Sequence, residues 1–309
     1  MSRLHKAHVL LVLVTVVWGA SFVLVKAALA DATPLLLNAL RMGLAAGVMA
    51  LYYRREWTRL SAPVVWAGLP VGIFLFLGYA LQTSGLRETT PSKSAFLTGV
   101  SVVLVPVFMV LFWRRVVKRW TAVGVALALV GLYLLTVPAS QTGTLLEGIN
   151  FGDLLTLGCA LAFAFQIIYL GRATHRYPFE PIAVLQLMVA AALTALAVPL
   201  LEAPSVTWSP SVLWAIAVTG LAGTAAAFSI QAWAQQFTPP THTALIFSLE
   251  PVFAGLISFL FLGERLGRRS LLGAALILAG VLFSELKGGA VEPAAPAGTP
   301  AEQAELEEA

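Results

Sequence analysis

Ten long apolar segments follow one another along this chain, separated by mostly short polar connections. A helix needs about 20 mainly apolar residues to cross the hydrocarbon core of a bilayer, and each segment reaches or approaches that length. The segments lack the alternation typical of strands, and helices are one of only two structures that satisfy their backbone within lipid. The sequence therefore predicts an all-α membrane protein with ten transmembrane helices. The predicted spans are 8–30, 34–53, 62–82, 91–113, 120–137, 152–171, 180–200, 210–231, 239–262 and 268–286.

The composition excludes the main classes of soluble protein. Hydrophobic residues make up 59% of the chain and charged residues 11%, whereas a soluble domain carries about 25% charged residues. Cys159 is the only cysteine, which excludes a disulfide scaffold. The four histidines are dispersed, so we expect no metal site, and we expect no cofactor. Basic residues cluster between the apolar segments, as topology requires, so nucleic acid is not an expected partner.

The distribution of Lys and Arg predicts the orientation of the chain. With the N-terminus inside, the inside segments carry twice as many Lys and Arg residues as the outside segments, and the first half supplies this bias. We therefore expect both termini in the cytoplasm of a bacterium, with the chain in the inner membrane. Residues 288–309 are acidic and rich in Ala and Pro, which predicts a disordered tail.

An internal repeat divides the chain into two halves. Residues 89–134 align without a gap on residues 238–283, at an offset of 149. Because the halves then contain five helices each, and five is odd, the second half must enter the membrane from the opposite side. We expect the first repeat over 1–140 and the second over 150–287. Such inverted repeats are common in secondary transporters, which bind their substrate near the midplane between the halves. The matched pairs include Thr89 and Thr238, Pro91 and Pro240, Arg119 and Arg268, Gly124 and Gly273, and Gly131 and Gly280.

Several local motifs resemble those of the drug/metabolite transporter superfamily, in its ten-helix EamA branch with two EamA repeats. They are Trp18-Gly19-Ala20-Ser21-Phe22, Arg41, Ser94-Ala95-Phe96-Leu97-Thr98-Gly99, Gly152-Asp153-Leu154-Leu155, Leu249-Glu250-Pro251-Val252-Phe253 and Leu262-Gly263-Glu264-Arg265. The resemblance covers residues 8–286, more loosely in the first half, where the loop Arg114–Arg119 lacks the Gly263-Glu264 pair. It implies export or exchange of small metabolites, often amino acids, by alternating access.

Two ionisable residues lie within predicted spans, where a charge costs about 2.5–3.5 kcal/mol on insertion scales. Glu250 is near the middle of the ninth span and directly precedes Pro251. It can couple transport to protons, bind a cationic group, or act as a structural carboxylate. Arg41, in the second span, can bind a substrate carboxylate bidentately. The alternatives for Arg41 are an approach to the outer interface or an ion pair with Glu250.

Uncharged candidates for a cavity lie on faces that the repeat makes equivalent. Ser94, Thr98 and Ser101 share one face of the fourth span, and aromatic residues share a face of the first. Packing between helices is the alternative role for each candidate. With Arg41 and Glu250, the predicted substrate-binding or cavity residues are Trp18, Phe22, Ser94, Thr98, Ser101, Gln166, Gln186, Gln231 and Phe247.

These features together predict a secondary transporter that exports or exchanges small metabolites, amino-acid-like or other small organic solutes. The expected partners are a small-molecule substrate and the lipid bilayer, with proton coupling open and no oligomeric state predicted. A non-transporting scaffold or receptor is one alternative. An intramembrane enzyme is less favoured, because Ser101 is mid-span while His242 starts the ninth span, and Glu250 is the only deep carboxylate. We therefore expect no enzymatic activity.

Overall fold

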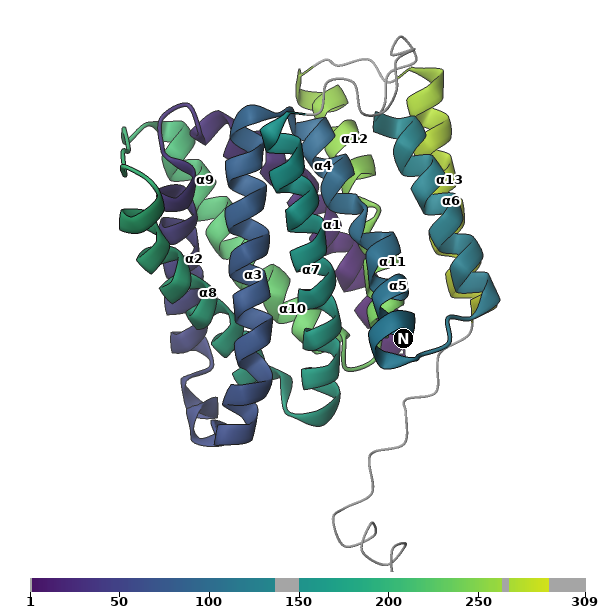
Figure 1. Cartoon of the computed structure of the whole chain (residues 1–309), viewed down its shortest axis with the longest axis horizontal. Helices are drawn as coiled ribbons and strands as arrows, with labels where there is room; N and C mark the ends of the chain where they lie inside the picture. The colour runs from purple at the N-terminus through teal and green to yellow at the C-terminus, as the bar shows by residue number, and fades with distance from the viewer. Residues whose placement is uncertain (1, 137–149, 263–266, 289–309) are drawn as a thin grey trace, which may run out of the picture.

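Residues 2–136, 150–262 and 267–288 are described by a computed structural model, and most of them are helical (Figure 1). The described residues form no strand, and a single isolated bridge joins Ala32 to Val206. The all-α prediction is therefore confirmed. The elements are α1 (Arg3–Ala28), α2 (Pro34–Tyr52), η1 (Arg54–Arg59), α3 (Ala62–Glu88), α4 (Pro91–Gly99), α5 (Ser101–Trp113), α6 (Arg119–Thr136), α7 (Phe151–Arg176), α8 (Phe179–Leu201), α9 (Pro210–Gly220), η2 (Leu221–Ala226), α10 (Ala227–Ala234), α11 (Pro240–Phe247), α12 (Glu250–Leu262) and α13 (Arg268–Gly288).

Each predicted span coincides with one helix or with consecutive helices, within a few residues at its ends. Among the described residues, seven helices are long and apolar enough to cross a membrane, and Arg119–Leu135 is a shorter apolar helix. The other two predicted spans are α11 with α12, and α13. The predicted tail from residue 289 onward and the Gly263-Glu264 pair lie outside the described residues.

Proline begins several of these helices. Pro34, Pro91 and Pro210 occupy their first turns, where the absent N–H would have no helical partner. Thr90 and Ser209 precede two of them and accept hydrogen bonds from backbone N–H groups of the first turn. The starts of these spans are therefore encoded locally in the sequence.

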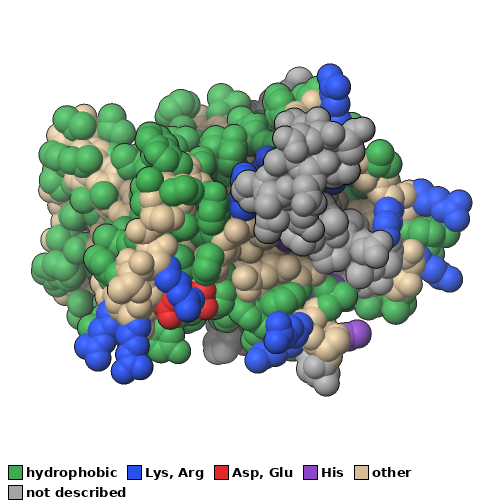
Figure 2. Space-filling view, turned by 90° about the horizontal axis from the view of Figure 1, so that it is seen from below, with side chains coloured by type: hydrophobic (Ala, Val, Ile, Leu, Met, Phe, Trp, Pro, Cys, Tyr) green, Lys and Arg blue, Asp and Glu red, His purple; other side chains and the backbone are tan. Residues whose placement is uncertain are grey.

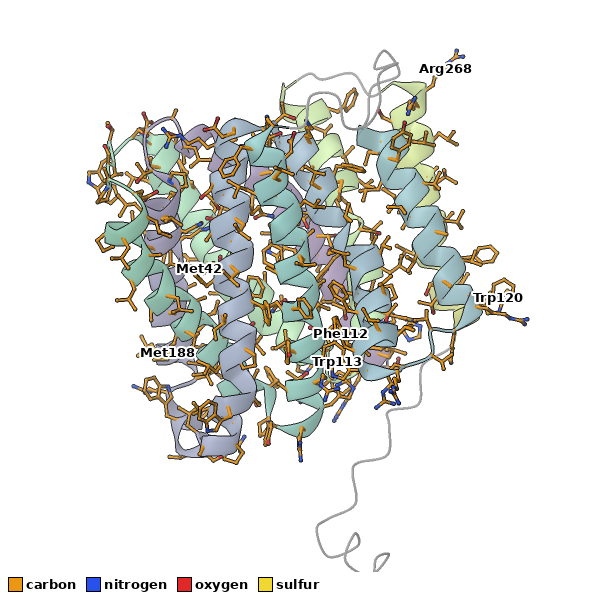
Figure 3. The ribbon with its side chains drawn as sticks, viewed as in Figure 1. Met42, Phe112, Trp113, Trp120, Met188 and Arg268 are labelled. Atoms are coloured by element: carbon orange, nitrogen blue, oxygen red, sulfur yellow. The ribbon has the colours of Figure 1, made fainter. Side chains whose placement is uncertain are left out.

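The two halves run through the bundle in opposite senses. The start of α7 lies against the end of α3, because a Cβ atom on Gly152 would be 2.6 Å from the Gly85 carbonyl oxygen. The start of α1 lies against the end of α10 in the same way, with Lys6 over the ring of Trp233. Trp120 in α6 and Arg268 in α13 are labelled at opposite ends of the α6–α13 pair in Figure 3. The inverted repeat is thereby confirmed.

Helices α6 and α13 form a reciprocal contact through small residues. A Cβ atom on Gly131 would lie 2.6 Å from the carbonyl oxygen of Gly273, and one on Gly124 would lie 2.6 Å from that of Gly280. The offset of 149 converts Gly124 to Gly273 and Gly131 to Gly280, so it exchanges the two contacts. A pseudo-twofold axis therefore passes between α6 and α13, and close backbone approach explains why glycine occupies all four positions.

Three predicted spans contain interruptions that hydropathy did not predict. The fourth span breaks at Val100, and the ninth breaks at Ser248 and Leu249. The offset of 149 places Val100 on Leu249, so the breaks are equivalent. In the ninth span Pro251 has no N–H to continue the helical ladder. The eighth span contains η2, a π-helical turn of the kind often found at functional sites.

The outside of the bundle is apolar, as contact with lipid requires. Large exposed side chains include Trp66, Leu196, Trp214, Leu260 and Leu282. Figure 2, seen from below, shows Lys and Arg side chains at several places on the lower end of the molecule. Basic side chains thus occur on this lower end of the bundle, while large hydrophobic groups are exposed on the bundle elsewhere.

Candidate functional site

A cavity lies where the two halves meet, at the level of the helix breaks. Its volume is about 60 Å³, which is room for a few ordered water molecules. A metabolite therefore needs a more open conformation than this one. The lining side chains and glycines are Trp18, Ser21, Phe22 and Val25 of α1, Arg41 of α2, Tyr79, Gln82, Thr83 and Leu86 of α3, Thr98 and Gly99 of α4, Ser101 of α5, Phe163, Gln166 and Ile167 of α7, Thr219 of α9, Gly223 of η2, Phe228 of α10, Phe247 of α11 and Glu250 of α12.

Eight of the eleven predicted site residues line this cavity: Trp18, Phe22, Arg41, Thr98, Ser101, Gln166, Phe247 and Glu250. The other three, Ser94, Gln186 and Gln231, are buried but do not line it. The structure thus brings most of the predicted residues together. Their part in substrate binding stays a prediction.

Aromatic rings form one wall of the cavity. The ring of Trp18 lies 5.5 Å from that of Phe228 and 4.8 Å from that of Phe247, centroid to centroid. Its indole Nε1 donates to the Gly223 carbonyl oxygen in the π-helical turn, at 2.7 Å. This wall connects α1 of the first half to the eighth and ninth spans of the second.

Gly19 allows α1 to approach the break in the ninth span. A Cβ atom at this position would lie 2.8 Å from the Ala254 backbone nitrogen and 3.0 Å from the Glu250 carbonyl oxygen. Both neighbours are backbone atoms, which cannot move aside as a flexible side chain can. The Trp18-Gly19 pair thus combines a cavity wall with a close helix contact.

Arg41 is buried without a counter-ion. Its residue surface is 3% exposed, and no described acidic side chain lies within 4.0 Å of its guanidinium. One nitrogen, Nη2, donates to Thr83 Oγ1 at 3.1 Å, and the guanidinium carbon lies 4.3 Å from the centre of the Tyr79 ring. The Nε atom has no hydrogen-bond partner. Arg41 therefore neither reaches an interface nor pairs with Glu250 in this conformation.

The residues around Arg41 are held in place by their own hydrogen bonds. Thr83 Oγ1 donates to Asn38 Oδ1 at 3.0 Å, and Asn38 Nδ2 donates to the Tyr79 carbonyl oxygen at 3.0 Å. These bonds connect α2 to α3 behind the guanidinium. They fix its orientation on the cavity wall.

Glu250 begins α12 immediately after the helix break and lines the same cavity. No hydrogen bond or ion pair of its carboxylate is found among the described residues. The carboxylate is therefore available to a proton or to a ligand. Arg41 and Tyr79 are the other ionisable side chains that line the cavity beside it.

A glutamine network lies behind the cavity in the second half. Gln166 Nε2 donates to Gln186 Oε1 at 3.1 Å, and Gln231 Nε2 donates to Gln166 Oε1 at 3.2 Å and to Gln235 Oε1 at 3.1 Å. Gln235 Nε2 in turn donates to the Ile167 carbonyl oxygen at 2.9 Å. Gln166, Gln186 and Gln231 were predicted as cavity residues, but of these three only Gln166 lines the cavity.

Gln186 is the structural counterpart of Arg41. A Cβ atom on Gly72 would lie 2.9 Å from the Gln186 carbonyl oxygen, and one on Gly220 would lie 3.2 Å from that of Arg41. The two contacts join the third span to the seventh and the eighth to the second, and the pseudo-twofold exchanges these pairs. The repeat thus places a cation in one half and a neutral amide in the other.

A polar cluster covers the end of the cavity next to Val25 and Leu86. Lys26 Nζ donates to the carbonyl oxygens of Leu86, Arg87 and Thr89, at 2.8, 3.1 and 2.8 Å. These bonds tie the end of α1 to the end of α3.

Beside Lys26, an ion pair joins α4 to α7. Lys93 Nζ lies 2.5 Å from Asp153 Oδ2, and Thr89 Oγ1 donates to the other carboxylate oxygen at 2.8 Å. The side chain of Asp153 is 3% exposed and that of Lys93 is 41% exposed. Asp153 also forms a capping box with Asn150 at the start of α7.

Sequence reasoning missed several residues of the site. Asn38 precedes Arg41 by three residues, a spacing that puts both on one helix face, so it could have been found. Tyr79 and Thr83 lie four residues apart on α3, but nothing local relates them to the second span. Their association with Arg41 depends on how the helices pack.

The fold and the cavity define a multi-pass membrane protein of two inverted five-helix repeats with a central cavity between them. Residues 5–137 and 150–286 each match the EamA-like transporter family, and the chain belongs to that family. It is 32% identical over 284 residues to an "Uncharacterized transporter" of Archaeoglobus fulgidus, covering 90% of this chain and 85% of the relative. It is 22% identical over 280 residues to "Uncharacterized transporter YoaV" of Bacillus subtilis, covering 88% and 94%. A solved crystal structure has the same fold, with a TM-score of 0.73, 19% identity, and coverage of 91% of this chain and 97% of that one.

Proposed function

We propose that this transporter exports or exchanges small organic solutes, amino-acid-like ones included, by alternating access across a bacterial inner membrane, with both termini in the cytoplasm. The observation that carries the proposal is one cavity, built jointly by two inverted halves, that contains a cation and an anion not paired with each other. In a pseudo-symmetric carrier, exchange of the two halves' conformations converts a state open to one side into a state open to the other.

The helix breaks supply the places where such a change can occur. Gly99 to Ser101 and Phe247 to Glu250 both border the cavity and occupy equivalent positions in the two repeats. A break in a helix lets its two parts change their angle without disturbing the rest of the span. We therefore assign the bending of each half to these two points.

Glu250 is the group we assign to proton or cation coupling. Its carboxylate lines the cavity and makes no hydrogen bond to the described residues. A structural carboxylate in a membrane normally has a partner, because an uncompensated charge there is expensive. The lack of a partner therefore favours a functional role over a structural one.

Flux measurements on the purified chain in lipid vesicles test transport. We expect uptake or counterflow of labelled small solutes, amino acids first, that saturates with solute concentration. Ser101→Trp fills the cavity and should abolish this flux, whereas Leu111→Trp, on the exposed face of the same helix, should retain it. Flux that does not saturate would indicate a channel. Lack of flux with every solute would leave a scaffold or receptor as the better description.

A further inference from the structure

We propose that Arg41 is a subsite for a carboxylate of the transported solute, an inference that rests on the proposed transport function. Arg41 presents a guanidinium to the cavity from α2, and the structure shows this group only partly satisfied. The ligand class that completes it is a singly charged oxyanion.

The charge balance of the site lacks an anion. Arg41 is 3% exposed and has no described acidic side chain within 4.0 Å, although burying an unpaired charge is strongly unfavourable. The same chain pairs its buried carboxylate Asp153 with Lys93. A solute anion would form an ion pair with Arg41, as Lys93 does with Asp153.

The structure gives the guanidinium one hydrogen bond and leaves one of its nitrogens, Nε, without a partner. The bond to Thr83 takes one N–H at Nη2, and the face of the group lies on the Tyr79 ring. Nε is buried and has no hydrogen-bond partner, so the Nε edge of the planar group still lacks an acceptor. A carboxylate accepts two parallel N–H bonds from such an edge, and a fixed donor loses little entropy on binding.

The repeat shows that the fold does not need a charge at this position. Gln186 occupies the equivalent place in the second half and accepts a hydrogen bond from Gln166. Gln186 does not line the cavity, whereas Arg41 does. A neutral amide is therefore sufficient for packing α8 against its neighbours. We infer that the charge of Arg41 in α2 serves ligand binding and not packing.

The other charges around the cavity favour a single carboxylate over a phosphate or a dianion. Arg41 is the only Lys or Arg among the described lining residues. Lys26, at the covered end, already donates to three carbonyl oxygens. Glu250 lines the same cavity and offers no positive charge to a second anionic group.

Thermal unfolding of the full chain in detergent, with matched acid and amide probes, tests this subsite. The probes are L-leucine with L-leucinamide, L-alanine with L-alaninamide, and pyruvate with pyruvamide; inorganic phosphate serves as a further anion. We expect at least one acid to raise the melting temperature of the wild type more than its amide or phosphate does. Arg41→Gln should weaken binding of that acid about 10- to 100-fold, as expected for lost bonds to a charged group, and should remove the preference over the amide.

Two further variants separate recognition from folding. Arg172→Gln makes the same chemical change at another Arg that lies over an aromatic ring, that of Trp113, but outside the cavity, and should keep the acid preference. Arg41→Lys retains the charge without the planar edge, and should bind the acid more weakly than the wild type while still preferring it to the amide. If Arg41→Gln does not fold, the acid–amide comparison in the wild type and in Arg41→Lys decides.

The proposal is overturned if no acid stabilises the wild type, if acids and amides act equally, or if Arg41→Gln keeps the preference. The outcome is separable from that of the transport proposal. Saturable flux of amides with no acid preference would leave transport standing and remove the subsite. Acid binding that depends on Arg41, with no flux of any solute, would support the subsite and count against transport.

Discussion

Replacing Asp153 with alanine removes three hydrogen bonds where α3, α4 and α7 meet. Its carboxylate accepts from Thr89 Oγ1 at 2.8 Å, from Lys93 Nζ at 2.5 Å and from the Asn150 backbone nitrogen at 2.9 Å. Bonds to a charged group are worth about 1.5–3 kcal/mol each when buried. Because the Lys93 side chain is 41% exposed and can turn to water, we discount that bond to about 1 kcal/mol. We expect Asp153→Ala to lower the free energy of unfolding by about 4 kcal/mol, which is the lower end for two such bonds plus the discounted one.

A double-mutant cycle isolates the ion pair within this total. Asp153→Ala, Lys93→Met and the double variant should give a coupling energy of about 1 kcal/mol. The matched control is the pair Glu56–Arg59, which also forms a short contact, 2.8 Å, but lies at the surface in η1. Its coupling should be only a few tenths of a kcal/mol, since exposed pairs gain little over hydration.

The assay is equilibrium unfolding of the purified chain in mixed micelles, followed by helical circular dichroism. A loss below about 1 kcal/mol for Asp153→Ala would refute the reasoning, because three bonds to a buried carboxylate must contribute more than one surface hydrogen bond. A coupling no larger than that of Glu56–Arg59 would show that Lys93 interacts mainly with water.

Four further predictions concern topology, the tail, the repeat contact and coupling. Cysteines at positions 115 and 268, in place of Arg115 and Arg268 in a background without the native cysteine, should label from opposite faces of the membrane; labelling from one face would contradict the inverted repeat. Removal of residues 289–309 should leave flux intact, because an acidic Pro/Ala tail has no apolar face to dock; a variant that reaches the membrane but loses flux would count against this. Gly273→Leu should separate α13 from α6 and lower the melting temperature by several degrees, whereas a shift near zero would show that the close contact does not matter. Glu250→Gln should fold and bind solute yet lose the pH dependence of flux, and an unchanged pH profile would remove the coupling role.

The spans and their inverted arrangement could be predicted from the sequence because both depend on local residue patterns. Apolar length predicts a membrane helix whatever its neighbours are. The repeat was visible because Gly124, Gly131 and their partners at positions 273 and 280 serve one close contact between α6 and α13. Where the contact between two helices tolerates only glycine, both halves have glycine, even if the apolar residues around it differ.

The break at Val100 has no local sign in the sequence, whereas Pro251 marks the break in the ninth span. Hydropathy remains high through Val100 and Leu249, so an apolar run gives no sign that the helix stops there. The partners of Arg41 could not be predicted, because they depend on contacts between distant segments. Arg41 is deep in its span, which suggested an ion pair with Glu250. Its actual neighbours, Tyr79 and Thr83, come from α3, and their register against α2 is set by packing.

The two repeats share a shape but divide the charges between them. The pseudo-twofold relates Arg41 to Gln186 and Glu250 to Ser101. Each ionisable side chain of the cavity therefore has a neutral side chain at the equivalent position of the other repeat. The first half therefore contributes the cation and the second half the anion. In the proposed alternating access, the halves would exchange conformations and the shape of the cavity would invert, while Arg41 and Glu250 would stay near the middle of their spans. A solute would then meet the same two charges from either side of the membrane, and only the direction of access would change.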